Sequence, residues 1–123
     1  MILVDTSVWI DHLRANSEAL TGLLAQGAVL AHPFVIGELA CGNLHNREVT
    51  LGLLDSLPKP ILATNHEAYH LIESRKLSGL GIGFLDVHLI GSCQLSDCTI
   101  WTRDKRLLGI AQNLGLALNS NPN

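Results

Sequence analysis

The sequence predicts an α/β fold in which a parallel sheet is covered by helices on both faces. Short apolar segments alternate along the chain with longer segments that have apolar residues at helical spacing. Parallel strands need crossover connections, which helices usually supply, and both faces of such a sheet are then buried. The chain has 123 residues, of which 47% are apolar. Residues 1–123 are therefore expected to form one domain with its own core, since no linker or repeat divides them.

The first strand is expected at Ile2–Val4, and a helix should begin almost at once after it. Asp5 follows the strand directly, and the hydroxyl residues Thr6 and Ser7 are common at helix N-termini. In open α/β sheets, ligands bind outside the carboxyl ends of the strands. Asp5 is therefore a candidate functional residue. Its alternative interpretation is a plain helix cap.

The remaining elements follow from the same patterns of apolar residues and turn residues. Further strands are expected at Ala28–Ala31, Ile61–Ala63, Cys98–Thr102 and Leu116–Leu118. Further helices are expected from Asn16-Ser17-Glu18 to Gly27, from Pro33 to Leu44, from Asn46 to Leu57, from Asn65 to about Leu77, from Phe84 to Leu95 and from Lys105 to Leu114. The glycine-rich stretch Ser78–Gly83 is expected to be the most mobile internal segment, and the tail Asn119–Asn123 to be frayed.

The composition argues against a membrane protein and indicates a reducing compartment. Only 15% of the residues are charged, which suggests much buried surface and leaves room for a subunit interface. No run of about 20 apolar residues occurs, and no basic, apolar leader opens the chain. The cysteines Cys41, Cys93 and Cys98 form no C-x-x-C pair and lie among apolar residues. We therefore expect free thiols and a cytoplasmic location.

Four acids lie in apolar surroundings, whereas most of the others have polar neighbours. Asp5 follows Ile2–Val4, Glu38 and Asp86 lie within apolar helical segments, and Asp104 follows the predicted strand before it. Carboxylates are rarely buried unless they are paired or bind a metal. No Lys or Arg lies within eight residues of Glu38 or within nine residues of Asp86. These acids are therefore candidates for a shared site.

Several carboxylates without cations repel one another, and a hard divalent cation with oxygen ligands relieves that repulsion. Mg²⁺ and Mn²⁺ suit such a site, because they prefer oxygen ligands and take phosphate oxygens from substrates. All four acids can reach one end of the predicted sheet. Each has a plain interpretation when taken alone, and Asp104 in particular fits the N-cap of the last helix. Together they predict a metal site.

This pattern resembles the PIN-domain family, and within it the VapC-type ribonucleases of bacterial and archaeal toxin–antitoxin pairs. The resemblance covers nearly the whole chain. It rests on the segments Ile2–Ser7, Glu38–Gly42, Gly81–Leu89 and Ile100–Leu107, the last with the pattern Thr-x-Asp-x-x-Leu. Each segment is weak evidence alone, but their order and spacing over one domain are specific.

The resemblance implies an endoribonuclease on a parallel sheet of five strands in a three-layer arrangement of helices and sheet. It implies that Asp5, Glu38, Asp86 and Asp104 coordinate one or two Mg²⁺ or Mn²⁺ ions and that Thr6, Ser7 and Thr102 support them. RNA would be hydrolysed to 5′-phosphate and 3′-hydroxyl ends. A homodimer and an antitoxin partner are also implied, with the apolar helices around Leu20–Leu24 and Val49–Leu57 as candidate surfaces.

The net charge of −3 does not by itself indicate a nucleic-acid-binding protein. The four candidate site acids would be offset by metal, which leaves seven other acids against eight Lys and Arg. Arg103, Lys105 and Arg106 flank Asp104 and are candidates to hold RNA phosphates. Their plain interpretation is the solvated start of a helix. Affinity for bulk RNA should be modest and sensitive to salt.

Two alternatives remain open. The chain could be a binding module without activity, stabilised by a metal. His66-Glu67-Ala68-Tyr69-His70 also matches the H-E-x-x-H pattern of zinc metalloproteases, with both histidines on one helix face. That motif begins at the start of its helix among polar residues, so a solvated histidine pair is the simpler interpretation. Trp9 and Trp101 are expected in the core, and His88 on another helix face than Asp86.

Overall fold

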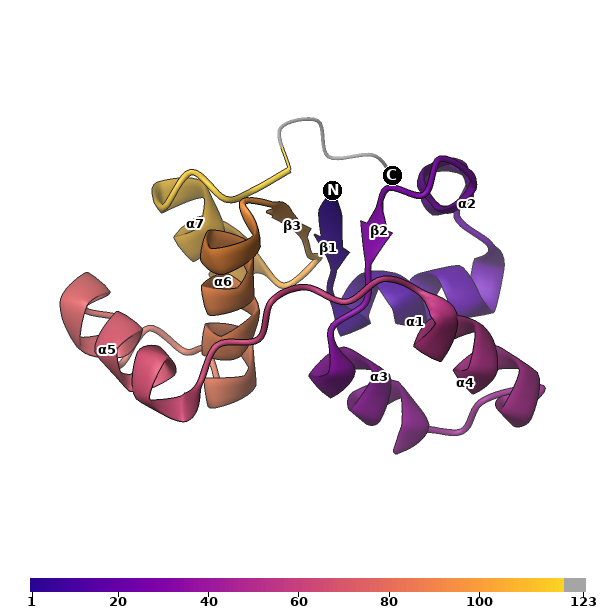
Figure 1. Ribbon diagram of the computed structural model, residues 1–123, viewed down its shortest axis with the longest axis horizontal. Coiled ribbons are helices and arrows are strands. Elements are labelled where there is room, and N and C mark those ends of the chain that lie inside the picture. The colour runs from indigo at the N-terminus through magenta and orange to yellow at the C-terminus, as the bar shows by residue number, and fades with distance from the viewer. Residues whose placement is uncertain (119–123) are drawn as a thin grey trace.

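The computed structural model describes residues 1–118 and confirms an α/β fold with a parallel sheet. The elements, in chain order, are β1 (Ile2–Val4), α1 (Thr6–Ala15), α2 (Glu18–Ala25), β2 (Val29–Leu30), α3 (Pro33–Ala40), α4 (Arg47–Ser56), α5 (Asn65–Arg75), α6 (Phe84–Ser96), β3 (Thr99–Trp101) and α7 (Lys105–Asn113). Helices flank the strands on both sides, with α5, α6 and α7 beyond β3 and α2 and α4 beyond β2 (Figure 1).

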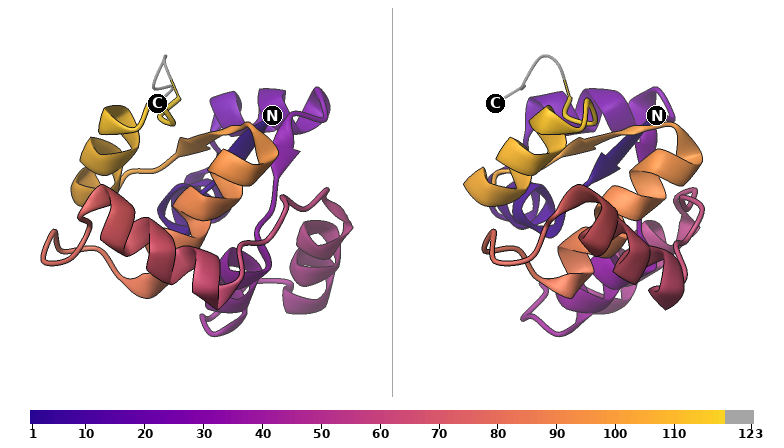
Figure 2. Two further views of the ribbon diagram at one scale, coloured as in Figure 1. Left: turned by 60° about the vertical axis from the view of Figure 1, so that its left-hand side comes forward. Right: turned by 90° about the vertical axis from the view of Figure 1, so that its left-hand side faces the viewer.

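The sheet has the order β2-β1-β3, and both pairings are parallel. Ile2 of β1 lies opposite Val29 on one side and Thr99 on the other. The central strand is thus the first one in the sequence, and its residues Leu3 and Val4 are fully buried. All three strands therefore end at one edge, where α1, α3 and α7 begin (Figure 1, with further views in Figure 2).

The prediction of five strands was wrong for the described residues, because Ile61–Ala63 forms no strand. The N–H of Ala31 donates to the carbonyl oxygen of Pro58, so this segment does pass the edge of β2. Pro58 and Pro60 have no N–H to extend that contact into a ladder. The N–H of Ile61 donates instead to the Ser96 hydroxyl at 2.8 Å. Pairing therefore stops after a single backbone bond.

The predicted strand Leu116–Leu118 forms only an isolated parallel bridge, between Ala117 and Ile100. Two backbone bonds flank that bridge, from the N–H of Ile100 to Leu116 and from the N–H of Leu118 to Ile100. The segment therefore lies beside β3 without forming a regular strand. The expected fraying of Asn119–Asn123 concerns residues outside the described range.

The predicted helices all exist, with shifted ends. α3 ends at Ala40 instead of Leu44. The cap of α5 is Thr64 and not Asn65: its hydroxyl accepts from the Glu67 N–H, and the Glu67 carboxylate accepts from the Thr64 N–H. This reciprocal pair satisfies two N–H groups that the helix itself cannot. Trp9 and Trp101 are buried in the core, as expected.

No helix within residues 1–118 is long and apolar enough to cross a membrane.

Candidate active site

Asp5 is a buried carboxylate at the end of the central strand. Its residue occupies the N-cap position of α1, but its side chain makes no cap bond to that helix. Instead Oδ2 accepts from the Ser7 hydroxyl at 3.0 Å and from the Thr102 hydroxyl at 2.7 Å. Asp5 is 6% exposed. Asp5 thus stands at the cap position of α1, but two hydroxyl groups and no cap bond fix the orientation of its carboxylate.

Thr102 connects the ends of the two neighbouring strands. Besides donating to Asp5, its buried hydroxyl accepts from the Asp104 N–H at 3.0 Å. The Ser7 hydroxyl accepts from the Arg103 N–H, also at 3.0 Å. Thr102 and Ser7 thus hold the segment after β3 against the start of α1. This places Asp104 beside Asp5, although they are far apart in the sequence.

Asp104 does cap α7, as one interpretation of the sequence held. Its Oδ1 accepts from the N–H groups of Arg106 and Leu107, at 2.9 and 3.1 Å. Both atoms belong to the first turn of α7, whose N–H groups have no partners within the helix. The capping bonds fix the carboxylate at the helix start, but they use only one of its two oxygens.

Glu38 reaches the same edge from the middle of α3. The Thr6 hydroxyl donates to its Oε1 at 2.8 Å. Glu38 is exposed, and it lines a cavity of about 450 Å³ that Arg14 also lines. The Thr6 bond therefore holds the end of a long, exposed side chain close to the start of α1.

The charges of the other three acids act on the Asp86 carboxyl. Burial raises the pKa of the Asp86 carboxyl, and the charges of Asp5, Asp104 and Glu38 raise it further, against the opposing effect of a bond from the Gly83 N–H. That bond joins Gly83 to Oδ2 at 3.2 Å. The four acids named from the sequence therefore lie close enough in space for their charges to interact.

The four acids share one pattern of hydrogen bonding. Each uses one carboxylate oxygen to accept protein hydrogen bonds: Oδ2 in Asp5 and Asp86, Oε1 in Glu38 and Oδ1 in Asp104. Within residues 1–118, the second oxygen of each acid accepts none. The carboxylates are thus oriented by the protein, and each keeps one oxygen available to another ligand.

These oxygens suit a hard divalent cation, which prefers carboxylate ligands. No three His, Cys, Asp or Glu side chains among the described residues lie close enough to enclose an ion directly. Mg²⁺ usually binds through one or two carboxylates and keeps several waters. A ring of oriented but spaced carboxylates is therefore compatible with Mg²⁺ by its donor chemistry.

The basic residues after β3 are only partly available. Arg103 Nε pairs with Asp11 at 2.7 Å, the one ion pair found within residues 1–118. Arg106 lies across the turn at Gly81, where an added Cβ would lie within 3 Å of its side chain. Arg103 was predicted to hold phosphates, but in the structure its guanidinium forms an ion pair with Asp11. Lys105 is exposed.

The comparisons with known proteins identify the family of the chain. A family model described as PIN domain matches residues 2–113. The chain belongs to the PIN-domain family. It is also 45% identical over 119 residues, 96% of each chain, to Ribonuclease VapC32 of Mycobacterium tuberculosis, in sequences from two strains. The resemblance to VapC-type PIN proteins that the sequence suggested is thereby confirmed.

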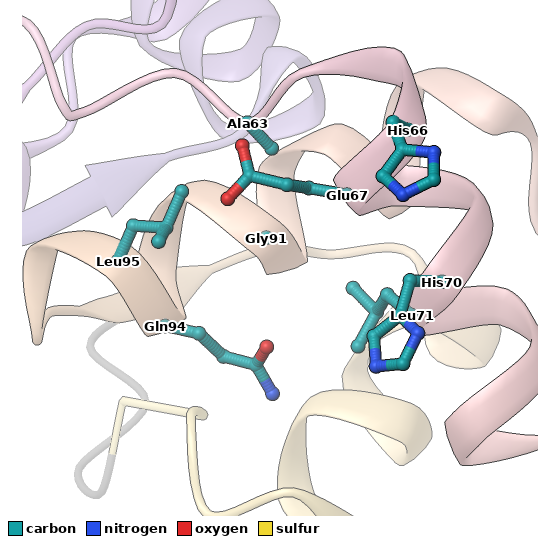
Figure 3. A pocket seen from close by; sticks show the side chains of 8 residues that line it. All are labelled: Ala63, His66, Glu67, His70, Leu71, Gly91, Gln94 and Leu95. Atoms are coloured by element: carbon teal, nitrogen blue, oxygen red, sulfur yellow. The ribbon is translucent and has the colours of Figure 1, made fainter.

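The two histidines and the glutamate of the H-E-x-x-H segment of this PIN domain line a cavity that none of the four acids lines. His66, Glu67 and His70 line a cavity of about 380 Å³ between α5 and α6, together with Gln94 and several apolar residues (Figure 3). The Glu67 carboxylate accepts the Thr64 N–H in the helix cap. The matching bond from the Glu67 N–H to the Thr64 hydroxyl completes this cap, so Glu67 has a role in the start of the helix. The structure thus gives the metalloprotease interpretation no support.

Two histidines are buried, His32 and His88, and of these the sequence analysis considered only His88. His32 caps α3, where its Nδ1 accepts from the Phe34 N–H at 3.0 Å, and His88 lies in α6. Within the described residues, Nε2 of each ring has no hydrogen-bond partner. Burial, and secondly the charge of His88, lowers the pKa of His32 to about 4. Their sequence neighbours are apolar and gave no sign that both rings would contact Phe34.

Proposed function

We propose that this chain is a metal-dependent endoribonuclease and the toxin of a type II toxin–antitoxin pair. The observation that carries the proposal is the set of four oriented acids, each with one carboxylate oxygen free, in a chain 45% identical to Ribonuclease VapC32. A structural role explains one oxygen of each acid but leaves the second unused. Charge repulsion at Asp86 is a cost that binding of a cation would remove.

Asp5, Glu38, Asp86 and Asp104 would hold Mg²⁺ or Mn²⁺. When bound, the cation would lower the pKa of a water molecule and neutralise charge on the phosphoryl oxygens of RNA. Ser7 and Thr102 orient Asp5, and Thr6 orients Glu38. Because these hydroxyl groups already orient the carboxylates, the acids need not reorient when RNA and metal bind. No side chain of this set needs to form a covalent bond, so water is the nucleophile and the ribose 3′ oxygen leaves.

Three cations remain candidates for contacts with RNA phosphates. Lys105 is exposed at the start of α7, Arg106 lies beside the Gly81 turn, and Arg14 lines the cavity that Glu38 also lines. Phosphate contacts of this kind fix the register of a nucleic acid without reading its sequence. Arg103 contributes less than the sequence suggested, because Asp11 neutralises it.

The antitoxin and a second copy of the chain are the proposed protein partners. Of the two surfaces suggested by the sequence, α4 is the more open one, since Val49 and Leu53 are both 64% exposed, whereas Leu20 of α2 is fully buried. Leu53 also lines an apolar cavity of about 290 Å³ with Trp9 and Leu24. Exposed apolar surface of this kind commonly marks a protein interface. A cytoplasmic location stays a prediction.

The test is gel-resolved cleavage of total RNA by the purified protein in Mg²⁺, Mn²⁺ or EDTA. We expect discrete cuts that require metal and that fall at least about a hundredfold in Asp5→Asn, since even residues that only orient a ligand contribute roughly 10–100-fold. Asp55→Asn, which changes an exposed acid of α4, is the matched control and should cut normally. Circular dichroism verifies that Asp5→Asn folds.

Absence of any cutting, in protein free of antitoxin, would favour a binding module without activity. Equal cutting by Asp5→Asn and the natural chain would disprove the assignment of the site. Either result would leave the PIN fold itself unaffected.

A further inference from the structure

The chain exposes its aromatic side chains in an unusual way. It has two Phe, one Tyr and two Trp residues. Both Trp side chains are buried, whereas Phe34 is 43%, Phe84 40% and Tyr69 57% exposed. Large aromatic rings contribute most to a core when buried, so three exposed rings in so small a set need an explanation.

The three exposed rings belong to one continuous cluster, which we call the aromatic array: His32, Phe34, Tyr69, Phe84 and His88. Tyr69 and Phe84 stack with centroids 5.2 Å apart and an interplanar angle of 23°. The His88 ring makes T-shaped contacts with Phe84 and Phe34, with ring centroids 4.7 and 5.1 Å apart. His32 lies 5.0 Å from Phe34. The array thus joins α3, α5 and α6 through ring contacts.

The array adjoins the four acids along two helices. Phe34 lies in the first turn of α3, and Glu38 is four residues later, a spacing that places both on one helix face. Phe84 is the first residue of α6, and Asp86 lies in the same first turn. Phe34 therefore lies on the helix face of Glu38, whereas Phe84 adjoins Asp86 along the chain only, since residues two apart in a helix do not face each other.

The buried part of the array holds the exposed rings in place. His32 and His88 are 1% and 3% exposed and pack behind the exposed rings. His32 Nδ1 also fixes the backbone of Phe34 by accepting its N–H. Because burial lowers the pKa of His32 to about 4, this ring is uncharged at neutral pH. A fixed, uncharged aromatic surface suits flat, uncharged ligands better than phosphates.

We propose that the aromatic array stacks unpaired bases of single-stranded RNA beside the phosphodiester that is cut. The inference rests on the proposed ribonuclease function and names how that site holds its substrate. Phosphate contacts are left to Lys105, Arg106 and Arg14, because Arg103 is already paired with Asp11. Bases carry no charge, and each base stacked on an aromatic side chain adds to affinity regardless of sequence.

The test compares two 12-nucleotide fluorescent RNAs, one with bases and one abasic, which carry the same phosphates. Their dissociation constants are measured by anisotropy in EDTA, where no metal-dependent cutting occurs. The natural chain should bind the RNA with bases roughly tenfold more tightly than the abasic one. Tyr69→Leu and Phe84→Leu should lose most of that preference. Tyr69→Phe, which keeps the ring, and Ile61→Ala, which changes an exposed apolar residue outside the array, should retain it.

The inference is overturned if Tyr69→Leu and Phe84→Leu keep the full preference for bases. It is equally overturned if these variants change only the mass of the protein in light scattering, because the array is then a protein interface. Tyr69 is the outermost ring, so its variants remain informative if Phe84→Leu does not fold. Because binding is measured without metal, a protein that fails to cut RNA can still pass or fail this test.

Discussion

At the scale of single residues, hydroxyl groups determine the orientation of the acids. Thr6 bonds Glu38, Ser7 bonds Asp5, and Thr102 bonds Asp5 and the backbone of Asp104. Of these three hydroxyl residues, Thr102 alone forms hydrogen bonds to two of the acids. It is buried, so any loss of its hydroxyl leaves hydrogen-bonding groups without partners.

Thr102→Val should therefore reduce RNA cleavage by about 10–100-fold and lower the free energy of unfolding by about 1–3 kcal/mol. Valine has nearly the same shape but leaves the Asp104 N–H without its acceptor and the Asp5 oxygen with the Ser7 hydroxyl alone. Thr102→Ser keeps the hydroxyl and should be close to the natural chain. Thr99→Val, at the start of β3, is the matched control. Cleavage rates and urea unfolding measure both effects, and normal cleavage by Thr102→Val would contradict this role.

The pKa of His32 makes stability depend on pH. Its folded value is about 4, below the ordinary value of 6.5, so the unfolded chain binds the proton more readily. Stability should be full above pH 6.5 and decline as the pH falls toward 4, by roughly 1–3 kcal/mol. His32→Asn can still cap α3 but does not titrate in this range, so its unfolding free energy should fall less. Parallel slopes for the two proteins would exclude His32 as the cause.

A carboxylate among apolar residues without nearby cations is visible in the sequence, so the four acids could be singled out. Their charges do act on Asp86, and their role as a metal site stays a prediction. The contacts of His88 with Phe34 and of Arg103 with Asp11 were not predicted. Each joins segments far apart in the chain, and no local pattern records which distant segment a side chain will meet. Residue types were therefore predicted better than their partners.

At the scale of elements, helices were predicted more accurately than strands. A helix depends on its own residues for hydrogen bonds and caps. A strand needs a partner, and Pro58 and Pro60 deny Ile61–Ala63 the N–H groups that would pair it. The apolar character of that segment predicted a strand, but the prolines before it limited the contact with β2 to one bond.

The cap of α5 separates the structural from the catalytic interpretation of Glu67. Glu67→Ala should lower the free energy of unfolding by about 1 kcal/mol, because it removes one half of a reciprocal cap. RNA cleavage should remain normal, since the cap lies outside the four-acid site. His66→Ala, next to it but outside the cap, is the matched control and should be neutral for both. A loss of hydrolytic activity in either variant would revive the zinc interpretation.

At the scale of the whole molecule, the fold brings four negative charges together and holds them there with hydrogen bonds from hydroxyl and backbone N–H groups. The three strand ends and the first turns of α1 and α7, with α3 and α6, present four acids to one edge of the sheet. A protein selected for stability alone would not place them so. The family resemblance was predictable because it lies in the order of four short segments along the chain. The distances between the acids in space were not predictable, since they depend on packing between helices.

Binding of Mn²⁺, followed by electron paramagnetic resonance titration, tests the central claim that these acids form one cation site. The natural chain and Asp55→Asn should show a saturable site. Asp5→Asn, Glu38→Gln, Asp86→Asn and Asp104→Asn should each bind Mn²⁺ at least about tenfold more weakly. If all four variants bind Mn²⁺ as tightly as the natural chain does, the four acids are not a metal site and the account is wrong.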